Sequence, residues 1–216
     1  MNIFHIRFNA VVRRFVLADL IWLGGWGLMS PIFGVFVVDK IPGGTVLTVG
    51  IGAAIYWVLK SVIQIPVALA IDRTPSERDD YLILVVSLML AGCTAFSFIL
   101  VKTVWQLYLV QAMQAVSFAL YIPSWNGIFT RHLDPEHRAL EFALDSAAVG
   151  VATGLAGLVG SIIADTFGFS VIFFMTAILS FVSAIIIFYS PSIIFPRHRQ
   201  GGSISSGDHT PRNLER

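Results

Sequence analysis

The stretch FSVIFFMTAILSFVSAIIIFY, residues Phe169–Tyr189, indicates the fold class because it holds no charged side chain over 21 positions. A helix rises about 1.5 Å per residue, so roughly 20 apolar residues cross the ~30 Å hydrocarbon core of a bilayer. Five similar runs precede it: Phe15–Val38, Val46–Ala70, Tyr81–Val101, Val104–Phe129 and Leu140–Ala164. We therefore predict an all-α membrane protein whose six transmembrane helices occupy residues 15–189.

The composition and the possible metal ligands narrow the function. Hydrophobic residues make up 56% of the chain and charged residues 12%, and the mean hydropathy is +0.80, values that do not fit a water-soluble domain of this size. The single cysteine, Cys93, excludes an intramolecular disulfide and a cysteine-based metal site, and all five histidines lie outside the apolar runs. We expect a protein of the lipid bilayer with no metal, no other cofactor and no nucleic-acid partner.

The placement of positive charges predicts the orientation of the chain. Loops on the cytoplasmic side of a membrane are enriched in Lys and Arg. If the N-terminus is cytoplasmic, only Lys40 and Lys102 of the 14 such residues face outward, and Lys60 lies within a run. We predict a multi-pass protein of the cell (cytoplasmic) membrane with both termini inside. Residues 1–14 would form a cytoplasmic segment, and the polar residues 190–216, which lack periodicity, a disordered cytoplasmic tail.

Polar and aromatic side chains recur along one face of the first and fourth runs. Spacings of three and four residues place such side chains on the same side of a helix. Each one alone could serve only to hydrogen-bond to a neighbouring helix, but stripes on two helices together favour a shared cavity. The predicted cavity residues are Trp22, Trp26, Gln111, Gln114, Tyr121 and Trp125. Their aromatic character suggests an uncharged or amphipathic organic solute.

Proline and glycine distinguish the helices further. Pro31, Pro66 and Pro123 are expected to interrupt the first, second and fourth helices, because proline lacks a backbone donor. The third and sixth runs are almost uniformly apolar, which favours contact with lipid. Small residues let backbones approach closely, so the fifth helix is predicted to pack tightly against another helix. Its small residues include Gly150, Gly154, Gly157 and Gly160.

Three ionisable residues lie at depth in the predicted spans: Asp19, Lys60 and Asp145. An unpaired charge in hydrocarbon is costly, so such residues either form ion pairs or serve a function. One interpretation is a structural ion pair of Lys60 with either carboxylate. The other is that a carboxylate exchanges protons as its partner moves, which makes all three candidates for proton or ion coupling, with Asp19 preferred over Asp145.

The connectors resemble those of a known family. Asp134–Ala139 is similar to an acidic-Pro-Glu-x-Arg connector, Gly154–Gly160 to a glycine-rich antiporter motif, and Phe167–Phe173 to the junction that opens a sixth helix. After the second run, Asp72-Arg73 stand where that family's loop motif has an acidic and a basic residue. These features together resemble one six-helix half of a major facilitator superfamily transporter.

The chain also departs from the family's patterns. Ala68 and Pro75 replace the two glycines of the loop motif, which puts ordinary gating in doubt. Many proton-coupled drug exporters carry an arginine in the fourth helix where this chain has Gln111, which weakens a drug/proton antiporter assignment. The resemblance still implies a gating loop, formed by Asp72, Arg73, Arg78, Glu136 and Arg138.

The resemblance implies a function and an assembly. Family members normally carry two six-helix halves with the substrate site between them, so a parallel homodimer would rebuild the twelve-helix transporter. Its second and fifth helices would meet the partner, its first and fourth would line the cavity, and its third and sixth would face lipid. We expect a secondary-active transporter of a small organic solute that works by alternating access.

Three alternatives remain at this stage. The first is one subunit, or a fragment, of a transporter whose other half is a different sequence. The second is a non-transporting membrane scaffold of the same fold. An intramembrane enzyme is least favoured. A serine protease of this kind needs a Gly-x-Ser-Gly nucleophile and a histidine inside the membrane, and the apolar runs contain neither.

Overall fold

The computed structural model describes residues 10–73, 77–133 and 137–190, and helices dominate this part of the chain. The helices are α1 (Ala10–Met29), α2 (Phe33–Lys40), α3 (Val46–Arg73), α4 (Glu77–Ser97), the 3₁₀ turn η2 (Phe98–Leu100), α5 (Val104–His132), α6 (Arg138–Phe167) and α7 (Phe169–Phe188). Within the described residues, six segments are long and apolar enough to cross a membrane, and no strand is present. The predicted all-α class with six long apolar helices is confirmed. Most of the predicted N-terminal segment (residues 1–9) and of the tail (residues 191–216) lies outside the described residues.

The first span is broken near its end. α1 stops at Met29 and α2 begins at Phe33, with the turn Ser30-Pro31-Ile32 between them. Proline cannot donate the backbone hydrogen bond that would continue the helix, so the break occurs where the sequence predicts it. Pro66 and Pro123, in contrast, lie inside the unbroken helices α3 and α5. Neighbouring helices can compensate for the missing bond, and the expected interruptions at these two prolines do not end the helix.

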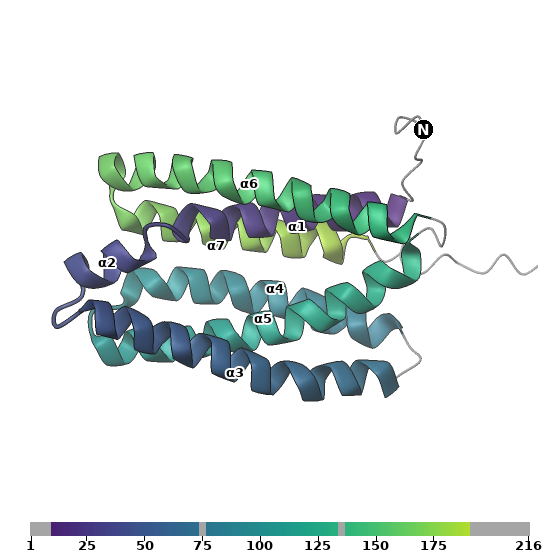
Figure 1. Cartoon of the computed structure of the whole chain (residues 1–216), viewed down its shortest axis with the longest axis horizontal. Coiled ribbons are helices and arrows are strands. Elements are labelled where there is room, and N and C mark those ends of the chain that lie inside the picture. The colour runs from purple at the N-terminus through teal and green to yellow at the C-terminus, as the bar shows by residue number, and fades with distance from the viewer. Residues whose placement is uncertain (1–9, 74–76, 134–136, 191–216) are drawn as a thin grey trace, which may run out of the picture.

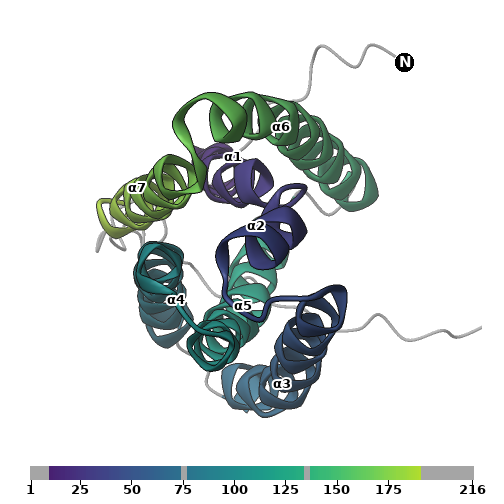
Figure 2. The same cartoon turned by 90° about the vertical axis from the view of Figure 1, so that its left-hand side faces the viewer.

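The long helices form an arc. α3 packs against α5, α5 against α4, α4 against α7, α7 against α1, and α1 against α6. The end view in Figure 2 shows α3 and α6 at the two ends of this arc, with α1, α2 and α5 on its inner side. In the side view of Figure 1, α1, α6 and α7 run along one side of the molecule and α3, α4 and α5 along the other.

The packing repeats within the chain. Exchanging α1, α3 and α4 with α5, α6 and α7 leaves the set of principal helix contacts unchanged, since α1·α6 becomes α5·α3 and α1·α7 becomes α5·α4. Each repeat contributes three spans, an odd number, so the two repeats run in opposite directions through the bundle. This relation places α1 and α5 in equivalent positions on either side of the inner face.

Hydrogen bonds from small polar side chains fix the α1–α7 contact. Thr176 Oγ1 donates to the carbonyl oxygen of Gly25 and Ser183 Oγ to that of Ala18, both at 2.8 Å. At the other side of α7, Tyr81 Oη on α4 donates to the carbonyl oxygen of Phe188 at 2.7 Å. Such bonds hold helices together where the hydrophobic effect between them is weak.

The helices differ in how much of their surface the chain itself covers. In the most apolar stretch of α4 and of α7, 44% of the residues are buried, against 11% in α3 and 17% in α6. The two nearly uniform apolar helices, α4 and α7, therefore bury one face in the core and expose the other. The largest uncovered surfaces belong to α3 and α6, at the ends of the arc.

Candidate functional site

Two neighbouring cavities lie on the inner side of the arc. The first has a volume of about 300 Å³ and lies between α1, α2, α3 and α5. The second, of about 330 Å³, lies between α1, α3 and α5. The side chains of Tyr56, Trp57 and Phe118 line both cavities and separate one from the other. Because these three residues line both cavities, the two cavities adjoin, and we describe them together as one hollow.

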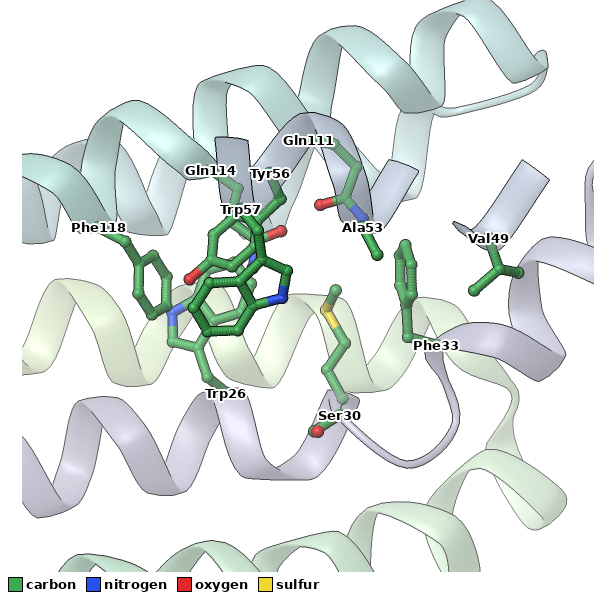
Figure 3. Close-up of a pocket in the computed structure, with 11 residues that line it drawn as sticks. Trp26, Ser30, Phe33, Val49, Ala53, Tyr56, Trp57, Gln111, Gln114 and Phe118 are labelled. Atoms are coloured by element: carbon green, nitrogen blue, oxygen red, sulfur yellow. The ribbon is translucent and has the colours of Figure 1, made fainter. Parts of the chain in front are cut away.

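The structure places all six predicted cavity residues at these cavities. Trp26, Gln111 and Gln114 line the first, and their side chains from α1 and α5 point toward one another in Figure 3. The other three line the second: Trp22, Tyr121 and Trp125. Helices α1 and α5 thus contribute from opposite sides, as their equivalent positions in the two repeats require.

Phe118 is at the centre of an aromatic cluster that the sequence analysis missed. Its ring centroid lies 4.7 Å from that of Trp22, 5.2 Å from that of Trp26 and 5.7 Å from that of Tyr56. A signal was available, because Phe118 follows Gln114 by four residues and so shares its helix face. A single Phe in an apolar run is also typical of a lipid-facing position, however, so it does not by itself indicate a binding site.

Asp19 is buried in the second cavity. It is 4% exposed, and Tyr121 Oη donates a short hydrogen bond of 2.5 Å to its Oδ1. This bond joins α1 to α5 across the inner side of the arc. A carboxyl group held at this depth beside a cavity is suited to binding a proton or a cationic group of a ligand.

Lys60 lines the same cavity from α3 but forms no ion pair with either carboxylate among the described residues. Its Nζ lies 4.5 Å from the ring centroid of Trp57 and 5.9 Å from that of Tyr56. An ammonium group over an aromatic face is stabilised by the ring quadrupole. The structural ion pair that the sequence allowed is therefore replaced here by a cation–π contact.

Asp145 is buried on α6, on the side of the bundle where α6 packs against α1. It is 8% exposed, and its Oδ1 has no hydrogen-bond partner among the described residues. Asp145 does not line either cavity of the inner face. Of the three predicted coupling residues, Asp19 and Lys60 therefore share a cavity, and Asp145 does not line it.

The four glycines predicted for helix packing also divide into two pairs. A Cβ on Gly160 would lie 2.1 Å from the carbonyl oxygen of Leu28, and one on Gly157 would lie 3.4 Å from the Pro31 ring. These two glycines serve the packing of α6 on α1. A Cβ on Gly150 or Gly154 would meet nothing within 4 Å. This second pair leaves space on the uncovered surface of α6.

The predicted gating-loop residues lie at one end of the bundle. Asp72 and Arg73 are exposed at the end of α3, and Arg78 and Arg138 are exposed near the starts of α4 and α6. Glu136, the fifth of them, lies outside the described residues.

An ion pair at this end was not anticipated. The Asp80 carboxylate, which is fully buried at the start of α4, accepts a hydrogen bond from the guanidinium of Arg131 near the end of α5. A Cβ on Gly127 would come within 3.2 Å of Arg131 Nη2, so the glycine provides room for the pair. Both charges flank apolar runs in the sequence, but the sequence alone does not show that they face one another.

An all-helical membrane protein with a hollow between its spans is the class that this fold and site define. The family model of the Major Facilitator Superfamily matches residues 16–211, and the chain belongs to this superfamily. Its members carry out transmembrane transport. No curated protein is similar enough in sequence to count as a match.

Proposed function

We propose that the chain is a secondary-active transporter of a small organic solute that works by alternating access as a parallel homodimer. The observation that carries this proposal is the hollow on the inner side of the arc, lined from α1, α2, α3 and α5 by aromatic and amide side chains. Cavities between helices, mostly apolar with a few polar groups, are the usual form of a small-molecule site.

The arc of helices supports the dimer. Two copies of one sequence insert into a membrane with the same orientation, because the placement of Lys and Arg sets it, so a twofold axis parallel to the helices can relate them. Two arcs related in this way face one another, and α3 of one copy meets α6 of the other. These are the two helices that the chain itself covers least. The open positions Gly150 and Gly154 permit a close approach of the partner's backbone.

Asp19 is the residue that we assign to proton coupling, with Asp145 second. The titratable and charged groups that face Asp19 are Tyr121 from α5, Asp145 from α6 and Lys60 from α3 across the cavity. On α7, the neutral Ser183 donates to the carbonyl oxygen of Ala18, the residue before Asp19. A change of position of α3 or α6 would alter the charge around Asp19, which is the requirement for coupling proton binding to a conformational change.

Transport into liposomes tests this function. Purified protein is reconstituted, a pH gradient is imposed, and the accumulation of a panel of radiolabelled small organic solutes is measured, with empty liposomes as the control. We expect protein-dependent accumulation of at least one solute that collapses when the gradient is dissipated, and its loss in Asp19→Asn. Accumulation that ignores the gradient, or that Asp19→Asn leaves unchanged, would refute the coupling assignment. Failure of the whole panel would count against transport and favour a scaffold role.

A further inference from the structure

The second cavity contains two opposite charges that do not neutralise one another. We propose that it binds a zwitterionic solute with an aromatic body, whose ammonium group faces Asp19 and whose anionic group faces Lys60. This inference rests on the proposed transport function, because it names the substrate class of the same site. Asp19 and Lys60 are the two charged residues that line this cavity.

The charges of Asp19 and Lys60 each contact a neutral group, so neither charge is compensated by an opposite one. One oxygen of the Asp19 carboxyl group accepts the Tyr121 hydroxyl, and the Lys60 ammonium lies over the Trp57 ring. Neither partner carries a formal charge, and an uncompensated charge at membrane depth is costly. A solute with one positive and one negative group compensates both at once. A solute with a single charge would leave one site charge unpaired and place a like charge near it.

The size and the walls of the cavity indicate the body of the solute. The volume is about 330 Å³, near the lower end of the range for small-molecule sites. Trp22, Phe118, Tyr121 and Trp125 present ring faces and edges to it. A flat apolar body of about the size of an amino-acid side chain can stack on these rings, while its ammonium group is directed toward Asp19 on α1 and its anionic group toward Lys60 on α3.

The competing possibility is that Lys60 takes no part in binding. A lysine side chain can extend its ammonium group away from apolar surroundings toward water, and Lys60 is only partly buried. The cavity would then carry a net negative charge and prefer an amine. The two possibilities predict opposite rankings of ligands that share one body and differ only in charge.

Binding of three such ligands to the purified full-length chain in lipid nanodiscs tests the inference. The probes are phenylalanine, which carries both charges, 2-phenylethylamine, which carries the positive one, and 3-phenylpropionate, which carries the negative one. Affinity is measured by calorimetry and by quenching of the intrinsic tryptophan fluorescence. We expect phenylalanine to bind at least about tenfold more tightly than either single-charge probe.

The variants assign each charge to its partner. Asp19→Asn should remove the advantage of phenylalanine over 3-phenylpropionate, and Lys60→Met should remove its advantage over 2-phenylethylamine. Lys40→Met is the matched control, because Lys40 is exposed on α2 and its Nζ lies 6.0 Å from the ring of Phe169, away from the cavity. This variant should keep the native ranking.

Three results would overturn the inference: the tightest binding by either single-charge probe, equal binding of all three, or binding of none by folded protein. Binding does not require transport, so the two proposals fail separately. Phenylalanine bound with the expected ranking but never transported would refute the transporter function and keep the zwitterion site. Gradient-driven accumulation of a solute with one charge would refute the zwitterion site and keep the transporter function.

Discussion

At the scale of single residues, the buried hydrogen bond between Tyr121 and Asp19 is the feature on which the site depends most. Asp19 comes from α1 and Tyr121 from α5, the two helices that occupy equivalent positions in the internal repeat. A carboxyl group that is 4% exposed needs such a donor, because a buried acceptor without a partner costs free energy. The sequence marked both residues through their spacing but did not show that they contact one another.

Removing the Tyr121 hydroxyl should therefore destabilise the bundle while leaving the aromatic wall in place. For Tyr121→Phe we expect the free energy of unfolding to fall by about 1–3 kcal/mol, the usual cost of an unpaired buried polar group. Unfolding is followed by circular dichroism in detergent micelles. Tyr108→Phe, at a partly exposed position on the same helix, is the matched control and should change little. Equal losses in both variants would contradict the role given to this bond.

At the scale of helices, the sequence predicted the length of each span. It predicted less well which neighbour each face of a helix contacts. Six runs gave six spans because the length of an apolar run is a local property. The helices extend beyond those runs at one end, as α3 to Arg73 and α5 to His132, because polar residues outside the hydrocarbon continue a helix at no cost. Which glycines of α6 touch α1 depends on its rotation about its own axis, and this is set by tertiary packing.

The two pairs of glycines on α6 provide a direct test of that rotation. Gly160→Ala would bring its Cβ within 2.1 Å of a backbone oxygen of α1, so we expect severe destabilisation or loss of folded protein. Gly150→Ala on the same helix meets nothing within 4 Å and should leave the stability of the single chain unchanged. The yield of folded protein by size-exclusion chromatography and its melting temperature are measured. Similar behaviour of the two variants would show that α6 is rotated differently.

The ion pair between Asp80 and Arg131 connects the start of α4 to the end of α5, so its loss is expected to loosen that end of the bundle. Arg131→Met leaves a fully buried carboxylate without its cation, at a cost on the order of 3 kcal/mol, the lower end for a broken buried pair because Arg131 is itself 37% exposed. Adding Asp80→Asn should recover part of the loss, because the remaining group is neutral. A double-mutant cycle of unfolding free energies measures the coupling. A coupling near zero would mean that the pair contributes nothing to stability.

At the scale of the whole molecule, the arc leaves its inner face without a second wall. The sequence predicted the division of labour among the helices by family resemblance, and the arrangement in Figure 2 is compatible with it. Composition assigned the cavity and lipid-facing helices but not the partner-facing ones, since an uncovered apolar helix looks the same whether lipid or protein covers it. The proposed dimer covers the exposed surfaces of α3 and α6 at once, because a single twofold axis places α3 of each copy against α6 of the other.

Disulfide cross-linking tests which helices meet. Val58 lies 12 residues after the start of α3, and Gly154 lies 13 residues before the end of α6, so both are at a similar depth on exposed surfaces. In a Cys93→Ser background, differently tagged copies with Val58→Cys and Gly154→Cys are mixed and oxidised. We expect a disulfide between the two tags. The exposed Val86→Cys on α4 should not cross-link to Gly154→Cys, and the opposite pattern would place the interface elsewhere.

The mass of the particle in native lipid nanodiscs tests the central claim most directly. We predict two copies of the 23.7 kDa chain for the native protein and one copy for Gly154→Leu, whose added side chain fills the space left on α6. Cys93→Leu, which places the same leucine side chain at an exposed position of α4, should keep the dimer. A native protein that remains a single copy would contradict a transporter completed by self-association, and a dimer that Gly154→Leu leaves intact would contradict the α3–α6 interface.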